Sequence, residues 1–233
     1  MLGIMGPVSD GMKIGLRHGF DSGASLDYVY RNQEGGRFVF GKIMDRGYLD
    51  AVGWRGIRQR KRQLQRMLEE RIAAHRGAAP LRILDVAAGS GRYVLESVKR
   101  FQDKNIEVTL RDFTQHNLDH ARALAEQLQL DVKVEYQLRD AFSPDSYRAA
   151  EGRYDIVVVS GLYELFSDNA PVSASLQGVF SVLRDGGYLI YTGQPWHPQL
   201  DMIALTLTSH RGCLLYTSPS PRDRTRSRMP SSA

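Results

Sequence analysis

The sequence predicts an α/β fold in which a mostly parallel β-sheet carries helices on both faces, preceded by an N-terminal helical arm. After Pro80, short runs rich in β-branched residues alternate with segments of helical periodicity. The run Tyr154–Ser160 (YDIVVVS) is apolar at nearly every position, which is typical of a central strand that is covered on both faces. These two observations together favour a doubly covered parallel sheet.

The expected strands share short, β-branched sequences; they are Arg82–Val86, Glu107–Arg111, Asp131–Tyr136, Tyr154–Ser160 and Gly187–Thr192. The expected helices of this region are Arg92–Gln102, Gln115–Gln127, Val172–Arg184 and Gln199–Ser209. Right-handed crossovers would bring the carboxyl ends of the strands to one edge of the sheet, where open α/β sheets bind their ligands.

Residues 1–79 are expected to form an arm of short helical pieces that ends in one longer helix. Ile57, Leu64, Leu68 and Ile72 form a stripe at helical spacing within it. Six basic residues and no acid lie between Arg55 and Arg66. This basic face is interpreted either as an ordinary solvated surface or as a surface for an anionic lipid or a phosphate-bearing substrate.

The charge of the chain is unevenly distributed. The 233 residues carry a formal net charge of +5, and the segment 213–233 holds four Arg against one Asp. Its Ser, Pro and Arg content predicts a disordered tail. The segment resembles translated adapter DNA, and the competing interpretation is a genuine phospho-regulated Arg/Ser tail. We therefore expect an arm (1–79), an α/β domain (80–212) whose last strands are missing, and a non-native tail (213–233).

Composition narrows the protein class further. The single Cys213 excludes an internal disulfide framework. No apolar run is long enough for a membrane-spanning helix, and the N-terminus does not resemble a signal peptide. These features predict a cytoplasmic protein.

The candidate ligand site begins where the first strand runs into a turn of small residues, Leu84–Arg92 (LDVAAGSGR). Gly89 and Gly91 allow the backbone to approach a ligand closely. A dinucleotide fingerprint would have a third Gly where Val94 stands. Asp85 precedes the turn; its carboxylate would repel a pyrophosphate but would suit a cation, such as the amino group of a methionine moiety.

Two more acids follow the next two strands. Asp112 lies 27 residues after Asp85 and is placed to take the hydroxyls of a ribose. Asp140, after the third strand, is placed to accept from an adenine amino group. Each acid alone fits an ordinary loop, but three at successive strand ends point to a site for a cationic nucleoside.

This pattern resembles the class I S-adenosylmethionine-dependent methyltransferases, over about residues 80–210, and implies their Rossmann-like fold. It also implies S-adenosyl-L-methionine as cofactor, bound at Asp85, Ala87, Gly89, Gly91, Asp112, Phe113, Asp140, Ala141 and Ser160. Ala87 departs from the family pattern, which commonly has Gly there. The segments HGFDSGASLDYVYRN, GWRGIRQRK, SGLYELF and YTGQPWHPQL further resemble bacterial methyltransferase domains fused behind an α/β-hydrolase domain. A fused hydrolase is therefore an expected partner in a longer protein.

The resemblance implies catalysis largely by positioning, because the methyl group of the cofactor is already activated. A general base is needed only for an acceptor that is protonated at neutral pH. Tyr163, Glu164 and His197 are the candidate catalytic residues, although Glu164 also fits a solvated helix acid.

Two groups of residues remain beside these candidates. His116 and His120 are four residues apart but lack an evident third ligand, so no metal is expected. Tyr28, Tyr30 and Arg31 of the arm are candidates for covering the cofactor.

Three functions therefore stay open. The favoured one is methyl transfer to a small or lipid-related acceptor. The second is an NAD(P)-dependent oxidoreductase on the same type of sheet. The third is a non-catalytic module that binds nucleic acid or another anion through Arg55–Arg66; a nucleic-acid partner is not favoured.

Overall fold

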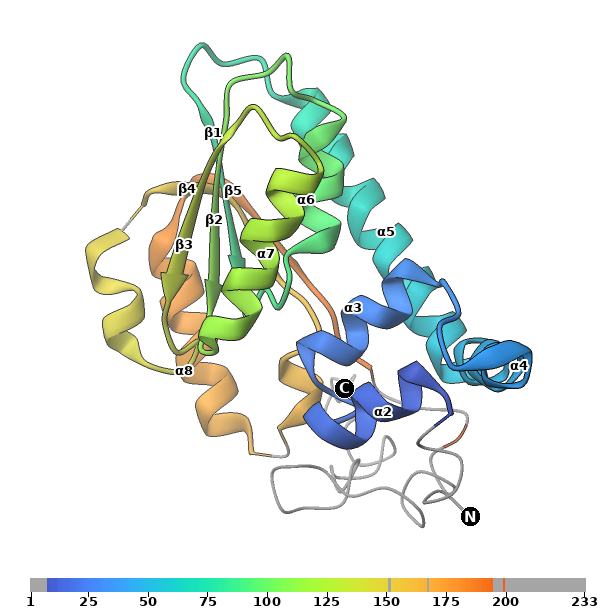
Figure 1. Cartoon of the computed structure of the whole chain (residues 1–233). Coiled ribbons are helices and arrows are strands. Elements are labelled where there is room, and N and C mark those ends of the chain that lie inside the picture. The colour runs from blue at the N-terminus through green and yellow to red at the C-terminus, as the bar shows by residue number, and fades with distance from the viewer. Residues whose placement is uncertain (1–7, 151, 167, 195–198, 200–233) are drawn as a thin grey trace, which may run out of the picture.

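The computed structural model describes residues 8–150, 152–166, 168–194 and 199, and its centre is a parallel five-stranded sheet (Figure 1). The strands are β1 (Leu81–Val86), β2 (Ile106–Asp112), β3 (Lys133–Leu138), β4 (Tyr154–Val159) and β5 (Leu183–Tyr191). Their order is β3-β2-β1-β4-β5, the order of Rossmann-like sheets. The predicted α/β class is confirmed.

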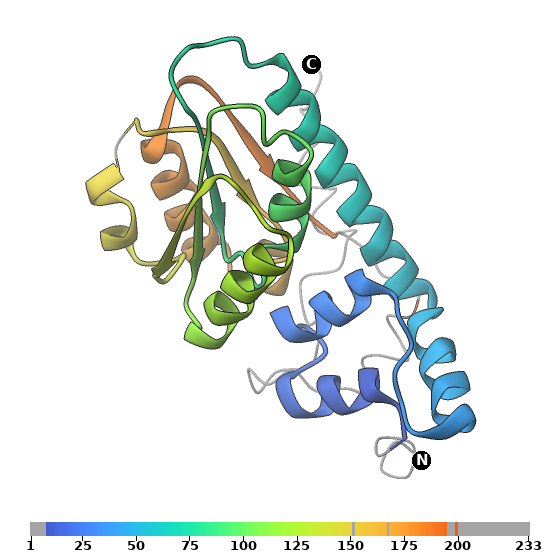
Figure 2. The same ribbon diagram turned by 45° about the horizontal axis from the view of Figure 1, so that its top comes forward.

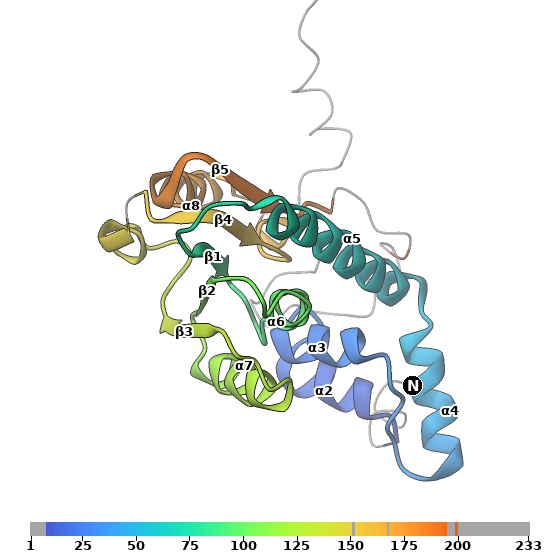
Figure 3. The same ribbon diagram turned by 90° about the horizontal axis from the view of Figure 1, so that it is seen from above.

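Helices cover both faces of the sheet, as Figure 3 shows. Helices α5 (Val52–Ala74), α6 (Arg92–Lys99) and α7 (Gln115–Gln127) lie on one face, and α8 (Asn169–Val182) lies on the other. Alternate residues of β4 enter the two cores, with Ile156 and Val158 facing α5 and α6. Val157 and Val159 pack with α8. This double burial explains why the β4 sequence is apolar without alternation.

The last described strand begins earlier than predicted. Leu183 pairs with Tyr154, whereas the next pair joins Tyr188 to Ile156, so residues 184–187 form a bulge. Gly186 has a φ of +73° within this bulge. The expected helix Val172–Arg184 was therefore too long at its end, because the short polar run Arg184–Gly187 belongs to the strand.

The arm is more regular than the sequence suggested. It consists of α2 (Asp10–His18), α3 (Gly23–Arg31), α4 (Phe38–Leu49) and the long α5, which runs from the arm along the sheet (Figure 2). Asp45 holds the arm together: it is fully buried and accepts hydrogen bonds from the Ser9 hydroxyl, the Tyr28 hydroxyl and the Gly35 amide.

Several expectations fall on residues that the structure does not describe. These are the helix Gln199–Ser209 beyond its first residue, the missing last strands, and the tail 213–233. Within the described ranges, no helix is both long and apolar enough to cross a bilayer.

Candidate functional site

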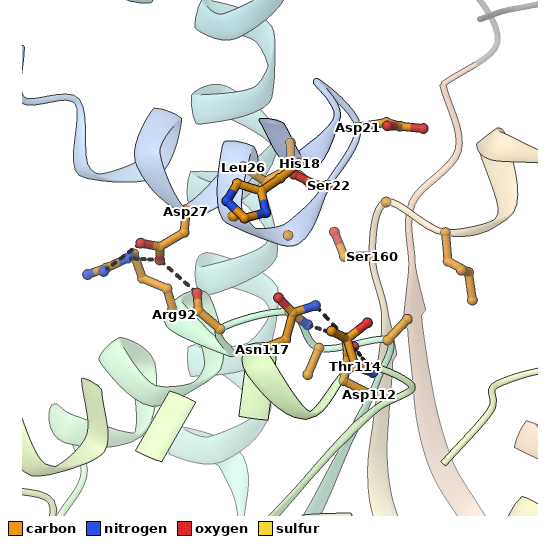
Figure 4. A pocket seen from close by; sticks show the side chains of 18 of the residues that line it. His18, Asp21, Ser22, Leu26, Asp27, Arg92, Asp112, Thr114, Asn117 and Ser160 are labelled. Atoms are coloured by element: carbon orange, nitrogen blue, oxygen red, sulfur yellow. Dashed lines mark hydrogen bonds and ion pairs between the residues drawn. The ribbon is translucent and has the colours of Figure 1, made fainter. Parts of the chain in front are cut away.

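A pocket of about 270 Å³ lies at the carboxyl ends of β1, β2 and β4, where the strand order reverses (Figure 4). Its lining comes from the loops after these three strands and from the arm. From the loops come Ala87–Ser90, Arg92, Tyr93, Asp112–Thr114, His116, Asn117, Ser160–Leu162 and Leu165; from the arm come His18, Asp21–Ala24, Leu26, Asp27 and Tyr30. The predicted position of the site, at the switch point of the sheet, agrees with this pocket.

The turn after β1 forms part of the pocket wall in a left-handed conformation. Ala87, Gly89 and Gly91 have φ angles of 55°, 57° and 62°. Gly91 is also packed so closely that a Cβ there would lie 2.7 Å from Cδ1 of Leu110. Ala87 takes this left-handed conformation although it has a Cβ, which is unfavourable there. Glycine adopts the conformation easily, which explains why the methyltransferase family that the sequence resembles commonly has Gly at this position.

Asp112 secures this turn from the β2 side. Its carboxylate accepts hydrogen bonds from the Gly89 amide (2.9 Å), the Thr114 amide (2.9 Å) and Nδ2 of Asn117 (3.0 Å). Asp112 also lines the pocket, so its carboxylate borders the space that a ligand would occupy. Burial raises the pKa of Asp112, and the hydrogen bonds from Thr114 and Gly89 oppose this shift.

Asp85 lies behind the pocket wall. It is fully buried, and Tyr93, which lines the pocket, donates its hydroxyl to Oδ1 of Asp85 at 2.6 Å. Burial raises the pKa of Asp85 to about 8, so the group is protonated at neutral pH. Its Oδ2 has no hydrogen-bond partner among the described residues.

The arm supplies the opposite wall, and sequence reasoning missed the residue that attaches it. Asp27 of α3 accepts from Oγ of Ser90 (2.7 Å) and from Nε of Arg92 (2.7 Å). A Cβ on Gly23, at the start of α3, would lie 3.2 Å from Cα of Gly89. The small residues of the segment DSGAS were the available signal, because they permit two backbones to approach each other.

Only one of the three arm residues expected to cover a ligand lies in the pocket wall. Tyr30 lines the pocket. Tyr28 instead donates to Asp45 inside the arm, and Arg31 pairs with Asp27 at 3.4 Å.

The predicted cofactor residues divide into two groups. Ala87, Gly89, Asp112, Phe113 and Ser160 line the pocket. The remaining four, Asp85, Gly91, Asp140 and Ala141, are not part of its lining. The Asp140 side chain accepts from the Phe142 amide at 2.9 Å.

Of the predicted catalytic residues, Tyr163 and Glu164 are described, and neither lines the pocket. Tyr163 is buried, and its hydroxyl lies 3.1 Å from Oγ of Ser175. Glu164 forms an ion pair with Arg60 at 2.6 Å, and the two side chains are only 5% and 15% exposed. Burial raises the pKa of Glu164, and the charge of Arg60 opposes that shift. His197 lies outside the described residues.

The basic face of α5 is therefore not wholly a solvated surface. Arg60 turns inward to Glu164, and Nζ of Lys61 lies 2.6 Å from Glu96 of α6. For these two residues the interpretation as a solvated face was wrong, because partners distant in sequence neutralise them.

His18 and His116 line the pocket, and His120 lies next to His116 outside the lining. The His116 and His120 rings lie 4.2 Å apart, and His18 of the arm stacks on His116 at 5.9 Å. Among the residues that the structure describes, no three His, Cys, Asp or Glu side chains are arranged to hold a metal ion.

Comparison with known proteins gives the family. A family model described as "Putative methyltransferase" matches residues 1–230. The Escherichia coli protein described as "Uncharacterized protein YnbC" is 44% identical over 209 residues, which are 89% of this chain and 36% of that relative. The chain thus spans about a third of the length of this relative.

Solved structures resemble parts of the chain. A "possible exported protein" from Bordetella parapertussis matches 87% of this chain and 70% of its own, with 18% identity and a TM-score of 0.58; this likeness concerns the fold alone. An S-adenosylmethionine-dependent methyltransferase from Geobacter sulfurreducens, solved with S-adenosyl-L-homocysteine, matches 66% of this chain and 58% of its own, with 19% identity and a TM-score of 0.44. By the match over residues 1–230, the chain belongs to the family described as "Putative methyltransferase".

Proposed function

We propose that this chain is an S-adenosylmethionine-dependent methyltransferase domain that binds its cofactor in the pocket of Figure 4. The observation that carries the proposal is the left-handed turn Ala87–Gly91, which Asp112 holds at the switch point of the sheet. It combines a close backbone approach with an acid in the pocket wall, to which a ribose hydroxyl could donate.

The residues present fit this cofactor. Ser160 lines the pocket, and its buried Oγ has no partner within the described part of the chain, so a polar ligand group would satisfy it. Phe113 also lines the pocket and is 72% exposed, which leaves an aromatic face for the adenine ring. Asp85 is not part of the lining, its pKa is raised to about 8, and it binds the hydroxyl of Tyr93, so we assign it to supporting the wall.

When bound, S-adenosylmethionine would supply a methyl group on a positively charged sulfur, which is already activated for transfer. The chain's own contribution would be orientation and exclusion of water. The turn after β1 forms one wall, and α3 forms the other, attached through Asp27. Each wall shields the pocket and limits the directions from which an acceptor can approach.

Glu164 is better placed for support than for proton transfer. Its Oε1 is bound to Arg60, and Nη2 of Arg60 lies 3.1 Å from the position that a Cβ on Gly161 would occupy. Gly161 lines the pocket, so the ion pair sits directly behind its wall. We therefore propose that Glu164 and Arg60 position the loop after β4. The acceptor stays assigned only as a small or lipid-related molecule.

Calorimetric titration tests the proposal. S-adenosylhomocysteine should bind the wild-type chain, and Asp112→Ala should weaken binding at least tenfold. Asp119→Ala is the matched control, because Asp119 is an exposed acid on α7 with a 53% exposed side chain. NAD should not bind. Tight NAD binding that Asp112→Ala abolishes would instead favour an oxidoreductase, and unchanged binding of S-adenosylhomocysteine in Asp112→Ala would remove the central argument.

A further inference from the structure

The first turns of α4 present an apolar surface to solvent. Phe38, Val39, Phe40 and Ile43 are 87%, 75%, 65% and 64% exposed, and we call these four side chains the α4 patch. By contrast, Phe180 of α8 is 64% exposed but stands alone, because no other large apolar side chain of α8 is similarly exposed. Grouped exposed apolar residues on a protein surface commonly mark an interaction site.

Specific contacts hold the backbone that carries the α4 patch in one conformation. Gly36 has a φ of +90°, and a Cβ there would lie 2.7 Å from both the Val8 carbonyl oxygen and the Gly41 backbone. The Gly36 amide donates to Asp10 at 2.7 Å, and the Arg37 amide donates to Val8. Phe38 itself has a φ of 57°. A bulky aromatic residue keeps that unusual conformation only where its surroundings impose it, so the turn holds Phe38 outward.

The charge around the patch is positive. The segment 35–44 (GGRFVFGKIM) contains two bases, Arg37 and Lys42, and no acid. Of the acids that flank this segment, Asp45 is fully buried and accepts hydrogen bonds inside the arm, so it adds no charge to the exposed surface. The other nearby acids form ion pairs. Asp10 binds Lys13 at 3.0 Å, and Arg46 binds both Asp50 (2.8 Å) and Glu34 (3.4 Å).

We propose that the α4 patch docks on an anionic lipid bilayer. Aromatic and aliphatic side chains bordered by cations suit the boundary between acyl chains and negatively charged head groups. A protein partner would have to supply a matching apolar surface, whereas an anionic bilayer supplies both the apolar layer and the counter-charge. Because the patch is small, binding is weak and reversible and depends on both the apolar and the basic residues.

The position of α4 is compatible with such docking. Figure 3 shows α4 at the edge of the molecule, with α3 and α5 between it and the sheet. The pocket lies between α3 and the loops at the sheet edge, and none of its lining residues belongs to α4. The docking does not depend on the proposed methyl transfer, and the two can fail separately.

Sedimentation of the full chain with vesicles tests the docking. The wild-type chain should sediment with vesicles of phosphatidylcholine mixed with phosphatidylglycerol, and at least tenfold more weakly with phosphatidylcholine alone. Replacing Phe38→Ser together with Phe40→Ser should lower the partition coefficient at least tenfold. Lys42→Glu should lower it as well, mainly at low salt. Phe180→Ser is the matched control, and should bind as the wild type does.

Three results would overturn the docking. The first is a wild-type chain that does not bind the mixed vesicles. The second is a double variant that binds them as well as the wild type while its circular dichroism is native. The third is a dimer in sedimentation velocity that the double variant disperses, because the α4 patch would then be an interface with a second copy. Since both phenylalanines are exposed, the double variant should fold normally.

Discussion

Asp27 joins the helical arm to the wall of the pocket, and its replacement by Asn should loosen both. The Asp27 carboxylate accepts from Ser90 at 2.7 Å and from Nε and Nη2 of Arg92 at 2.7 and 3.2 Å. In Asp27→Asn the side chain would keep its size but lose its charge and one strong acceptor. Arg92, only 14% exposed at its side chain, would then be left without its main counter-charge.

The expected loss of stability is about 2–3 kcal/mol. Removing one partner of a fully buried ion pair costs about 3–5 kcal/mol, and a hydrogen bond to a charged group contributes about 1.5–3 kcal/mol. We take the lower range because Asp27 is 13% exposed, and because Glu96, 3.4 Å from Nη1 of Arg92, can share its charge. For a chain of this size, that loss corresponds to a fall in Tm of roughly 5–10 °C.

The assay is urea unfolding followed by circular dichroism, together with calorimetric titration of S-adenosylhomocysteine. Asp50→Asn is the matched control, because Asp50 also pairs with an Arg but is 58% exposed, so its loss should cost about 0–1 kcal/mol. Binding should weaken in Asp27→Asn only. If the two variants lose equal stability, the attachment of the arm through Asp27 is refuted.

The effect of Asp27→Asn should also depend on pH. Burial by itself would raise the pKa of Asp27, but the hydrogen bonds from Arg92 and Ser90 and the charge of Arg92 lower it overall. A lowered pKa in the folded state stabilises the fold above the unfolded-state pKa, about 3.9 for Asp. The stabilisation is lost as the pH falls through the folded pKa. The difference between wild type and variant should therefore shrink below about pH 4.

Three further predictions can be tested separately. Because the pKa of Asp85 is raised to about 8 in the folded state, the stability of the fold should fall as the pH rises from about 4 to 8. Asp85→Asn should flatten this pH dependence in urea unfolding, and an unchanged slope would contradict the assignment. Gly91 has a φ of +62°, and a Cβ there would lie 2.7 Å from Leu110, so Gly91→Ala should lower the stability measured by thermal unfolding by about 2–4 kcal/mol. Ala87→Gly should change the stability by less than about 1 kcal/mol, and equal effects of the two variants would contradict the geometry. Glu164→Gln leaves Arg60 buried without its charged partner and should lower the free energy of unfolding by about 2–4 kcal/mol. Adding Arg60→Met to Glu164→Gln should restore part of that stability, and a double-mutant cycle measures how much.

The sheet and the place of the pocket could be predicted because both depend on local pattern. The β4 sequence signals burial on both faces, and parallel strands connected by helices place their carboxyl ends together. The turn Ala87–Gly91 directly follows β1, and Asp112 is the last residue of the neighbouring strand β2, so the pairing of these two strands is enough to bring them together.

The other wall of the pocket could not be predicted, because it depends on pairs distant in sequence. Asp27 meets Ser90 across 63 positions, and Arg60 meets Glu164 across 104. Hydrophobic periodicity reports which face of a helix is apolar, but it does not report which charge on the other face has a buried partner. For that reason Arg60 was predicted on a basic surface, although it lies behind the pocket.

The turn after β1 is held from two sides, and this complicates the role of Asp112. Asp112 accepts from the Gly89 amide, and Asp27 accepts from the next side chain, Ser90. Loss of binding in Asp112→Ala could therefore reflect a collapsed turn as well as a lost contact with the ribose.

A ligand that lacks one ribose hydroxyl separates the two roles of Asp112. If Asp112 accepts from that hydroxyl, the wild-type chain should bind S-adenosylhomocysteine more tightly than its 2′-deoxy or its 3′-deoxy analogue, by about tenfold for one charge-assisted hydrogen bond. Asp112→Asn should reduce this preference, whatever happens to the absolute affinity, because the variant has lost the charged acceptor. If Asp112 only supports the turn, both affinities should fall together and the preference should survive. A preserved preference in Asp112→Asn would assign the ribose contact to another residue and leave Asp112 as a support of the turn.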